Sequence, residues 1–450
     1  MPAEARHGGA LAAAGIALWA TGLVAEHVTA LLFFVVAMVF EVAGARTVFS
    51  GFSSPALWML FSGSIIGSAV QKTGLGARIA HAISRRVGAS YSGILLGILL
   101  VAGVLTFLMP SSTGRIVLLM PIALSLADAF GFEQGRKGRT GIVMMTGLAA
   151  FLLGFGILPA NVPNLVMLGA ADTIQNVKLV YGEYLWLHYP VLSLLKAGVI
   201  FLVVRFIFPD RVSMPAEGQA VAGPLSRDER VLVLIICSTL LLWTTDFWHG
   251  ISPAWVALAG AIACLMPPAS LIRPDDTNPI TPMRPLLYIG GILSLGAVVA
   301  ETGFADHAAN AFLAVADLQQ GDDTRNFFVI VLASLGISVL GTAPTVPAVM
   351  MPLAAKLAAA TGLSVGTIIM MQPPAFSTVL LPFQGPPIVI AMQLGKVRMA
   401  DGIKVTLAVG LVSLLILFLL MGSGAGYISA RLHKMLNGVT YQRTTLLVAF

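Results

Sequence analysis

FLMPSSTGRIVLLMP, residues 107–121, places an arginine in the middle of an otherwise apolar run. Its polar centre comprises Ser111, Ser112, Thr113 and Arg115. A charge at the centre of a bilayer costs from about 2.5 to well over 10 kcal/mol, so it persists only beside a water-filled cavity or a partner group. The stretch therefore predicts a polar site inside a membrane domain.

The composition of the whole chain agrees with a membrane protein. Of its 450 residues, 57% are hydrophobic and only 10% are charged, whereas soluble domains carry about 25% charged residues. Helices satisfy their own backbone hydrogen bonds in lipid, so we expect an all-α polytopic membrane protein. The net charge of +6 is typical of cytoplasmic loops, and we expect no nucleic-acid partner.

The two halves of the chain repeat each other. GSAVQKTGLGARIAHA (67–82) matches GAVVAETGFADHAANA (296–311) at a constant offset. In each half an apolar pair of segments with a polar break follows, at 109–124 and 340–355. A span interrupted by prolines comes next, at 156–168 and 379–391. Two repeats that each contain broken helices are typical of secondary transporters.

Treating each apolar pair as a re-entrant hairpin gives each half five spans and one hairpin, so the halves have opposite orientations. We therefore predict two inverted repeats whose broken helices meet at the membrane midplane. The first repeat covers 1–208, with a hairpin at about 89–130 and a broken span at 141–172. After a linker at 209–228, the second covers 229–422, with a hairpin at about 326–360 and a broken span at 364–395, and a C-terminal tail follows at 423–450.

The distribution of positive charge predicts the orientation. Lysines and arginines are about twice as frequent in loops on the side of the linker as on the opposite side, so we expect the linker to be cytoplasmic and the protein to lie in the cell (inner) membrane. If both hairpins crossed fully, segments 74–88 and 133–140 would place cations on opposite faces. We expect the amphipathic segments 74–88 and 303–320 to lie along the membrane faces.

The polar breaks supply candidate ligands. Helix N-termini attract anions, while hydroxyls and unwound carbonyls suit sodium. We predict that Ser111, Ser112, Thr113, Arg115 and Asn164 bind the substrate, and that Ser111, Thr113, Asn161 and Gln384 bind an ion.

Each of these residues also has a purely structural interpretation. In that interpretation the hydroxyls serve as caps of the following helix, and Arg115 forms a structural ion pair with Glu41 or Asp246. The prolines then have no role beyond kinking their spans. Lys196, in the middle of a predicted span, is either a structural charge partner or a coupling residue.

These motifs resemble the divalent anion/sodium symporters of the ion transporter superfamily, over roughly residues 50–420. That family has a Ser-Asn-Thr triplet at each hairpin tip, a proline ten positions on, and a Pro-rich break. Here the matching stretches are Ser111-Ser112-Thr113 with Pro121, Val162-Pro163-Asn164, Thr342-Ala343-Pro344 with Pro352, and Gly385-Pro386-Pro387.

The resemblance implies a transporter of dicarboxylates, citrate or sulfate that works by elevator-type alternating access, commonly as a homodimer. It adds Thr342, Thr345 and Pro386 to the expected substrate contacts, and Thr342 to the ion contacts. Beyond sodium as coupling ion it implies no cofactor and no metal.

The chain also departs from the family pattern. Ser112 and Ala343 stand where both triplets have asparagine, and Arg115 follows the first triplet. Our hypothesis is that Arg115 supplies a positive charge that sodium would otherwise bring, so that transport uses fewer sodium ions, protons or anion exchange.

Three other functions are the alternatives to an anion transporter. A cation/proton antiporter of the same superfamily would need a buried carboxylate at a hairpin tip, and neither tip has one. A metalloid-oxyanion permease is a further alternative. An intramembrane enzyme would need catalytic residues, but the chain has no HExxH motif, no P-loop and no cluster of cysteine or histidine.

Overall fold

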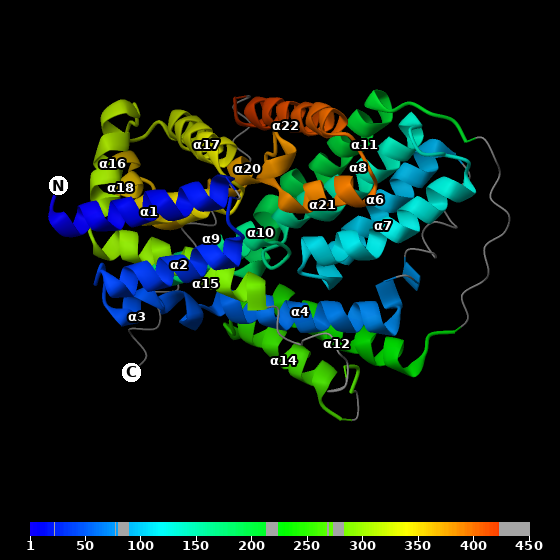
Figure 1. Cartoon of the computed structure of the whole chain (residues 1–450), viewed down its shortest axis with the longest axis horizontal. Coiled ribbons are helices and arrows are strands. Elements are labelled where there is room, and N and C mark those ends of the chain that lie inside the picture. The colour runs from blue at the N-terminus through cyan, green and yellow to red at the C-terminus, as the bar shows by residue number, and fades with distance from the viewer. Residues whose placement is uncertain are drawn as a thin grey trace.

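The computed structural model describes residues 1–422 apart from 22, 77, 80–89, 213–223, 268–269 and 273–282. Every element in this part of the chain is helical, as the sequence predicted (Figure 1). Most of the predicted linker, most of the segment 74–88 and the tail 423–450 lie outside the described residues.

The first half contains a helical hairpin, a broken span and a long final helix. Its elements are α1 (Ala3–Thr21), α2 (Glu26–Val39), α3 (Ala45–Val48), η1 (Ser50–Ser53), α4 (Pro55–Thr73), α6 (Tyr91–Leu108), α7 (Ser112–Ala129), α8 (Lys137–Leu152), η2 (Leu153–Gly156), α9 (Val162–Gln175), α10 (Tyr181–His188), the π-helix η3 (Tyr189–Leu195) and α11 (Lys196–Ile207).

The second half contains the same kinds of element. They are α12 (Arg227–Thr244), α13 (Asp246–His249), α14 (Pro253–Leu265), α15 (Met283–Glu301), α16 (Phe304–Val315), α17 (Asp323–Leu340), α18 (Thr345–Thr361), α19 (Val365–Met370), α20 (Pro373–Phe376), η4 (Pro382–Gln384), α21 (Pro386–Leu394) and α22 (Met399–Gly422).

The order of the elements agrees with an internal repeat. The helices α4 and α15 each have 19 residues and precede the hairpins α6–α7 and α17–α18. Each hairpin precedes a broken span, and each broken span precedes a long helical stretch. The opposite orientation of the two halves stays a prediction.

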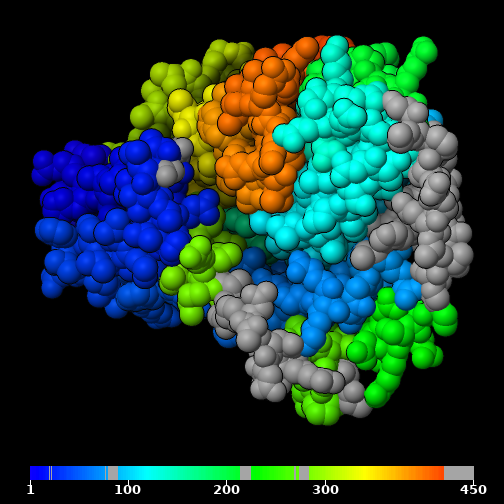
Figure 2. Space-filling view, turned by 45° about the vertical axis from the view of Figure 1, so that its right-hand side comes forward, coloured from blue at the N-terminus to red at the C-terminus, as the bar shows by residue number. Residues whose placement is uncertain are grey.

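The helix α8 is the centre of one group of helices. Its residues from Gly141 to Leu152 are buried without interruption, and α6, α7, α11 and α21 pack against it. A second group is formed by α4 with α12 and α14, and by α15 with α1 and α2. On the face shown in Figure 2, a recess lies between the blue N-terminal helices and the orange segment with α21.

A salt bridge outside the apolar helices ties α8 to the end of α11. The carboxylate of Asp210 accepts hydrogen bonds from Nη2 of Arg136 at 2.5 Å and from the backbone N–H groups of Gly138 and Arg211, both at 2.8 Å. Burial raises the pKa of this carboxyl group, but these hydrogen bonds outweigh burial and hold the pKa below its ordinary value. The stabilisation is therefore present at neutral pH and is lost as the pH falls through the lowered pKa.

The tip of the first hairpin is buried against the middle of α4. Met109 and Pro110, between α6 and α7, are both buried. A side chain at Gly63, near the middle of α4, would lie 2.7 Å from Cγ of Pro110. The 19 residues of α4 extend about 28 Å, close to the thickness of the hydrocarbon core. The tip thus lies about halfway along a helix of membrane-spanning length.

The second broken span is interrupted over a longer stretch than the first. The first break runs from Leu153 to Asn161, close to the predicted prolines. In the second half helical structure already stops at Met370, and only the short α20 and η4 interrupt the stretch before α21. Pro373 and Pro374, which precede the proline-interrupted stretch 379–391, explain the early break because proline disrupts a helix.

Seven helical stretches in the described part of the chain are long and apolar enough to cross a membrane. Three of them are the hairpin helices α6, α7 and α17. Length and composition alone therefore do not separate a hairpin that turns back inside the membrane from one that crosses it. The buried tip beside Gly63 favours the first arrangement.

The close approach of Pro110 to α4 leads to a testable prediction. Gly63→Ala should lower the free energy of unfolding by about 1–3 kcal/mol, as overpacking does elsewhere. The control is Gly336→Ala in α17, where the added methyl group meets open space and alanine favours the helix. Thermal unfolding of the purified proteins in detergent measures both. Equal stability of the two variants would contradict the described contact.

Candidate functional site

Arg115 is the only fully buried arginine in the described part of the chain, and its guanidinium is surrounded by oxygen atoms. Its Nε donates to the carbonyl of Ala150 at 2.9 Å, and Nη1 donates to the carbonyls of Ala160, at 3.1 Å, and Met109. Nη2 donates to Oγ of Ser112 at 3.0 Å. The side chain therefore joins the first hairpin to both sides of the first broken span.

These carbonyls are available because two helices end here and the backbone before a third helix is unwound. Met109 follows the end of α6, Ala150 lies in the last turn of α8, and Ala160 lies in the unwound segment before α9. The last carbonyls of a helix have no partner within the helix, and an unpaired polar group is costly in an apolar interior. A guanidinium with five N–H donors can satisfy several of them at once.

The partners of Arg115 include no carboxylate. Glu41, one of the two acids considered from the sequence, is exposed. Asp246, the other, accepts hydrogen bonds from the backbone N–H groups of Tyr181, at 2.6 Å, and Gly182, at 3.4 Å. Among the described residues, the positive charge of Arg115 is thus stabilised by the dipoles of carbonyl and hydroxyl groups and not by a negative charge.

Asn161 provides a free donor beside this charge. Its Oδ1 caps α9 by accepting from the N–H of Asn164 at 3.1 Å, while its buried Nδ2 has no partner among the described residues. A methyl group at Gly154 would lie 3.0 Å from Nη2 of Arg115 and 3.2 Å from this Nδ2. The two nitrogen groups therefore border the same point of the first break.

Asn164, in contrast, is fully committed to the protein. Its Nδ2 donates to the carbonyls of Gly154, Phe155 and Ile157 at 2.9–3.3 Å, and its Oδ1 accepts from the hydroxyl of Tyr184 at 3.3 Å. In this conformation Asn164 shapes the break, and its predicted contact with substrate would need another conformation.

The three hydroxyls of the first tip differ in exposure. Ser111 caps α7 by accepting from the N–H of Gly114 at 3.1 Å and is half-buried. Ser112 is buried against Arg115. Thr113 is exposed on the first turn of α7. Ser111 is therefore the N-cap of α7, and Thr113 is the hydroxyl residue most accessible to a ligand.

The tip of the second hairpin is held by a glutamine instead of an arginine. Oε1 of Gln384 accepts from the N–H groups of Leu380 and Leu381 at 2.7–2.8 Å, and Nε2 donates to the carbonyl and Oγ of Ser338 at 3.0 and 3.1 Å. The backbone carbonyl of Gln384 accepts from the N–H of Ala343 at 3.0 Å. Both ends of this amide are occupied, which leaves no group for the predicted ion in this conformation.

The remaining predicted residues of the second half surround this contact. Oγ1 of Thr345 accepts from the N–H of Thr342 at 3.3 Å and lies 3.4 Å from Oγ1 of Thr342. Both threonines are buried, whereas Pro386 is exposed at the start of α21. Packing of α21 on α7, and of α18 on α9, brings each half into contact with the other.

Lys196 lies at the second break and not at the first. It is 4% exposed, and its Nζ donates to the carbonyl and Oγ of Ser377 at 2.8 and 3.0 Å. Ser377 follows α20 in the unwound segment. Each broken span therefore has one buried cation, Arg115 from a hairpin and Lys196 from α11.

Sequence reasoning missed several contributors to the site. Gly63 and Gly154 allow close approaches that only the folded chain reveals, and Tyr184 supports Asn164 from the next helix, α10. The pair Pro373-Pro374 was a visible signal for the early second break. Groups of three or more His, Cys, Asp or Glu side chains that could hold a metal are absent from the described residues.

Comparison with known proteins gives relatives along most of the chain. SdcS, a sodium-dependent dicarboxylate transporter from Staphylococcus aureus (strain USA300), is 22% identical over 439 residues, which are 90% of this chain and 82% of SdcS. A membrane protein of Cupriavidus necator is 26% identical over 324 residues, 66% of this chain, and the chain spans 63% of that relative's length.

A solved structure has a similar fold. The YdaH transporter of Alcanivorax borkumensis matches with a TM-score of 0.57 and 14% identity, over 87% of this chain and 89% of YdaH. At this identity the likeness concerns the fold alone.

The family model described as the sodium:sulfate symporter transmembrane region matches residues 1–427. This match confirms the family resemblance that the hairpin motifs indicated. The family and the relatives show that the protein is a multi-pass membrane transporter and not an enzyme. The chain belongs to the family of the sodium:sulfate symporter transmembrane region.

Proposed function

We propose that the protein is a secondary active transporter of small dicarboxylate-like or sulfate-like anions in the cell (inner) membrane, with Arg115 as the resident cation of its anion site. The observation that carries the proposal is the buried guanidinium at the junction of the first hairpin and the first break, with the free Nδ2 of Asn161 beside it. A fixed positive charge attracts an anion strongly where water is excluded.

Further groups support an anion at this place. The N-termini of α7 and α9, capped by Ser111 and Asn161, present positive dipole ends. Thr113 is exposed on the first turn of α7. Arg115 itself is enclosed by protein oxygens, so in this conformation it acts on the anion through its charge, and direct contact falls to Thr113 and Nδ2 of Asn161.

The same geometry supports reduced dependence on sodium. Backbone carbonyls of unwound segments together with a hydroxyl are the ligands that sodium prefers in such transporters. Here the carbonyls of Met109, Ala150 and Ala160 and the hydroxyl of Ser112 already receive hydrogen bonds from Arg115. We infer that the guanidinium takes the place of one coupling ion, which favours anion exchange or coupling to protons.

An elevator movement of a homodimer is the mechanism we propose for translocation. The group of helices around α8 carries the first hairpin and α21, and a recess lies between α21 and the N-terminal helices on one face (Figure 2). Both hairpins would then be re-entrant, with the linker on the cytoplasmic side.

A cation/proton antiporter is the alternative that the site argues against. The buried carboxylates of the described residues are Glu229 and Asp246. Glu229 pairs with Arg78 at 2.6 Å, Asp246 caps the start of α10, and neither lies at a hairpin tip.

Transport assays test the proposed function directly. Purified protein in liposomes loaded with succinate, citrate or sulfate should exchange at least one of these anions for the same radiolabelled anion outside. Exchange should change by less than about twofold when sodium is replaced by choline, because the resident cation does not leave. Strict dependence on sodium would contradict the role of Arg115, and exchange of none of the anions would contradict the proposed substrate class.

Removing Arg115 should create a sodium site. Arg115→Ala leaves carbonyl oxygens without donors, which should lower the melting temperature and abolish exchange. Sodium, but not choline, should raise the melting temperature of this variant by several degrees, because an ion that binds only the folded state stabilises it. Arg205→Ala, which removes a partly buried arginine bonded to Ser92, is the control. An equal sodium response in both variants would contradict the proposal.

A substitution at Asn161 can separate the two roles of its side chain, which are the N-cap of α9 through Oδ1 and the proposed anion contact through Nδ2. Asn161→Ser keeps an N-cap side chain but removes the free Nδ2, so anion affinity should fall about 10- to 100-fold while stability changes little. Titration of the melting temperature with succinate, citrate and sulfate measures the affinity. Unchanged affinity for the transported anion would exclude Nδ2 as a ligand.

A further inference from the structure

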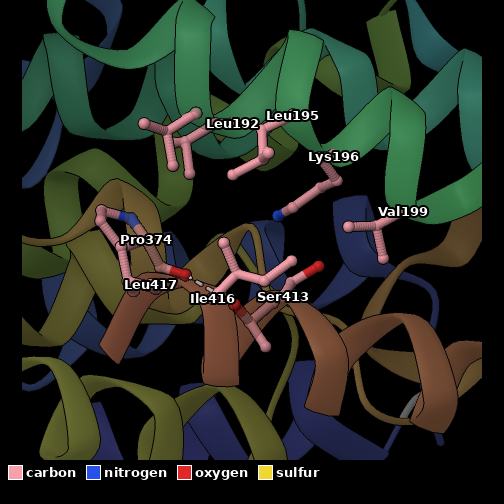
Figure 3. Close-up of a pocket in the computed structure, with 10 residues that line it drawn as sticks. Leu192, Leu195, Lys196, Val199, Pro374, Ser413, Ile416 and Leu417 are labelled. Atoms are coloured by element: carbon pink, nitrogen blue, oxygen red, sulfur yellow. Dashed lines mark hydrogen bonds between the residues drawn. The ribbon is translucent and has the colours of Figure 1, made fainter. Parts of the chain in front are cut away.

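A small cavity lies beside Lys196 (Figure 3), and none of the residues that line it belongs to the first hairpin. Its volume is about 20 Å³, which is room for about one water molecule. Its walls come from η3 and α11, from the second broken span, and from α22. Most of them are aliphatic side chains, and the polar groups that line it are those of Lys196, Thr378 and Ser413.

Two of these polar groups have unused hydrogen-bonding capacity. A lysine ammonium has three N–H donors, and the described partners of Lys196 are the two oxygens of Ser377. The hydroxyl of Ser413 is buried and has no partner among the described residues. In Figure 3 the side chain of Lys196 extends from α11 toward α22, the helix that carries Ser413. A water molecule in the cavity would satisfy both groups.

Lys196 has no charged neighbour in this cavity, and it is the only titratable group among the ten residues that line it. The titratable residues nearest to Lys196 along the chain are Tyr189 in η3, His188 in α10 and Arg205 in α11. The helix α20 has no titratable residue. On α22, Asp401 and Lys404 lie at the start of the helix, and α8 has no titratable residue from Gly141 to Leu152. Lysine, unlike arginine, is able to give up its proton inside a protein.

We propose that Lys196, with the water in this cavity, is a proton-binding site that couples proton movement to anion transport. The proposal rests on the function proposed above. On one side of the membrane a hydronium ion gives a proton to the neutral amine and becomes water. On the other side the ammonium returns the proton to water, which becomes hydronium, so no other reactant is needed. The site is separate from the anion site and takes only a proton.

The charge balance gives the physical reason for coupling. With Lys196 protonated, the two buried cations match a dianion, and the loaded protein carries no net charge at these sites. After the anion leaves, loss of the proton reduces the uncompensated charge from two to one. Buried charge is costly in a membrane, so the empty protein returns more readily when Lys196 is neutral.

Proteoliposomes with radiolabelled succinate and sulfate test this coupling. Net uptake by the wild-type protein should rise by up to about tenfold for each pH unit of external acidification, as for a single titrating group. In Lys196→Arg the charge is permanent, so the response of net uptake to pH should disappear while exchange between equal pools stays measurable. Arg205→Lys, at the far end of α11, should keep the response. A response to pH in Lys196→Arg as large as in the wild type would overturn the proposal.

A second measurement does not depend on transport. A group that titrates in the folded protein makes stability depend on pH. The difference in melting temperature between the wild type and Lys196→Arg should therefore change between about pH 5 and about pH 9, and Ser413→Ala should shift the midpoint of this change. A constant difference over this range would overturn the proposal even if anion exchange is observed. Failure of the wild type to exchange either anion would instead count against the proposed function.

Discussion

The hydrogen bonds of Arg115 to carbonyl oxygens are the interaction on which the first half of the site depends. Two helix ends and one unwound segment lie within reach of one guanidinium, and each presents a carbonyl group that needs a donor in an apolar interior. One arginine from the hairpin meets that need and brings a permanent charge to the same place. The stability of the break and the attraction of an anion therefore have a single source.

In the second half, different residues join the hairpin to the broken span. The amide of Gln384 links the second break to Ser338 of the second hairpin without adding a charge. A cation reaches this break from α11 instead, through Lys196 and Ser377. The two halves thus share the order of their elements while their chemistry differs, and this difference separates a permanent cation from one that can lose its proton.

The sequence was sufficient for the helical class and the family, because charge, proline and hydroxyl residues stand out in apolar sequence. It was not sufficient for the partners of Arg115. Those partners are main-chain carbonyls 35 and 45 residues away, and any residue type carries a carbonyl. The contact of Pro110 with Gly63 was equally invisible, because a missing side chain leaves no pattern. The roles of Asn161 and Asn164 depend on which amide atoms the folded backbone occupies, and residue identity alone does not reveal this.

An experimental density map of the protein in lipid nanodiscs, recorded in sodium-rich buffer, tests the central claim most directly. The account predicts density for the guanidinium of Arg115 within hydrogen-bonding distance of the carbonyls of Ala150 and Ala160. Density for a separate ion among these carbonyls, with the arginine side chain turned toward lipid, would contradict it.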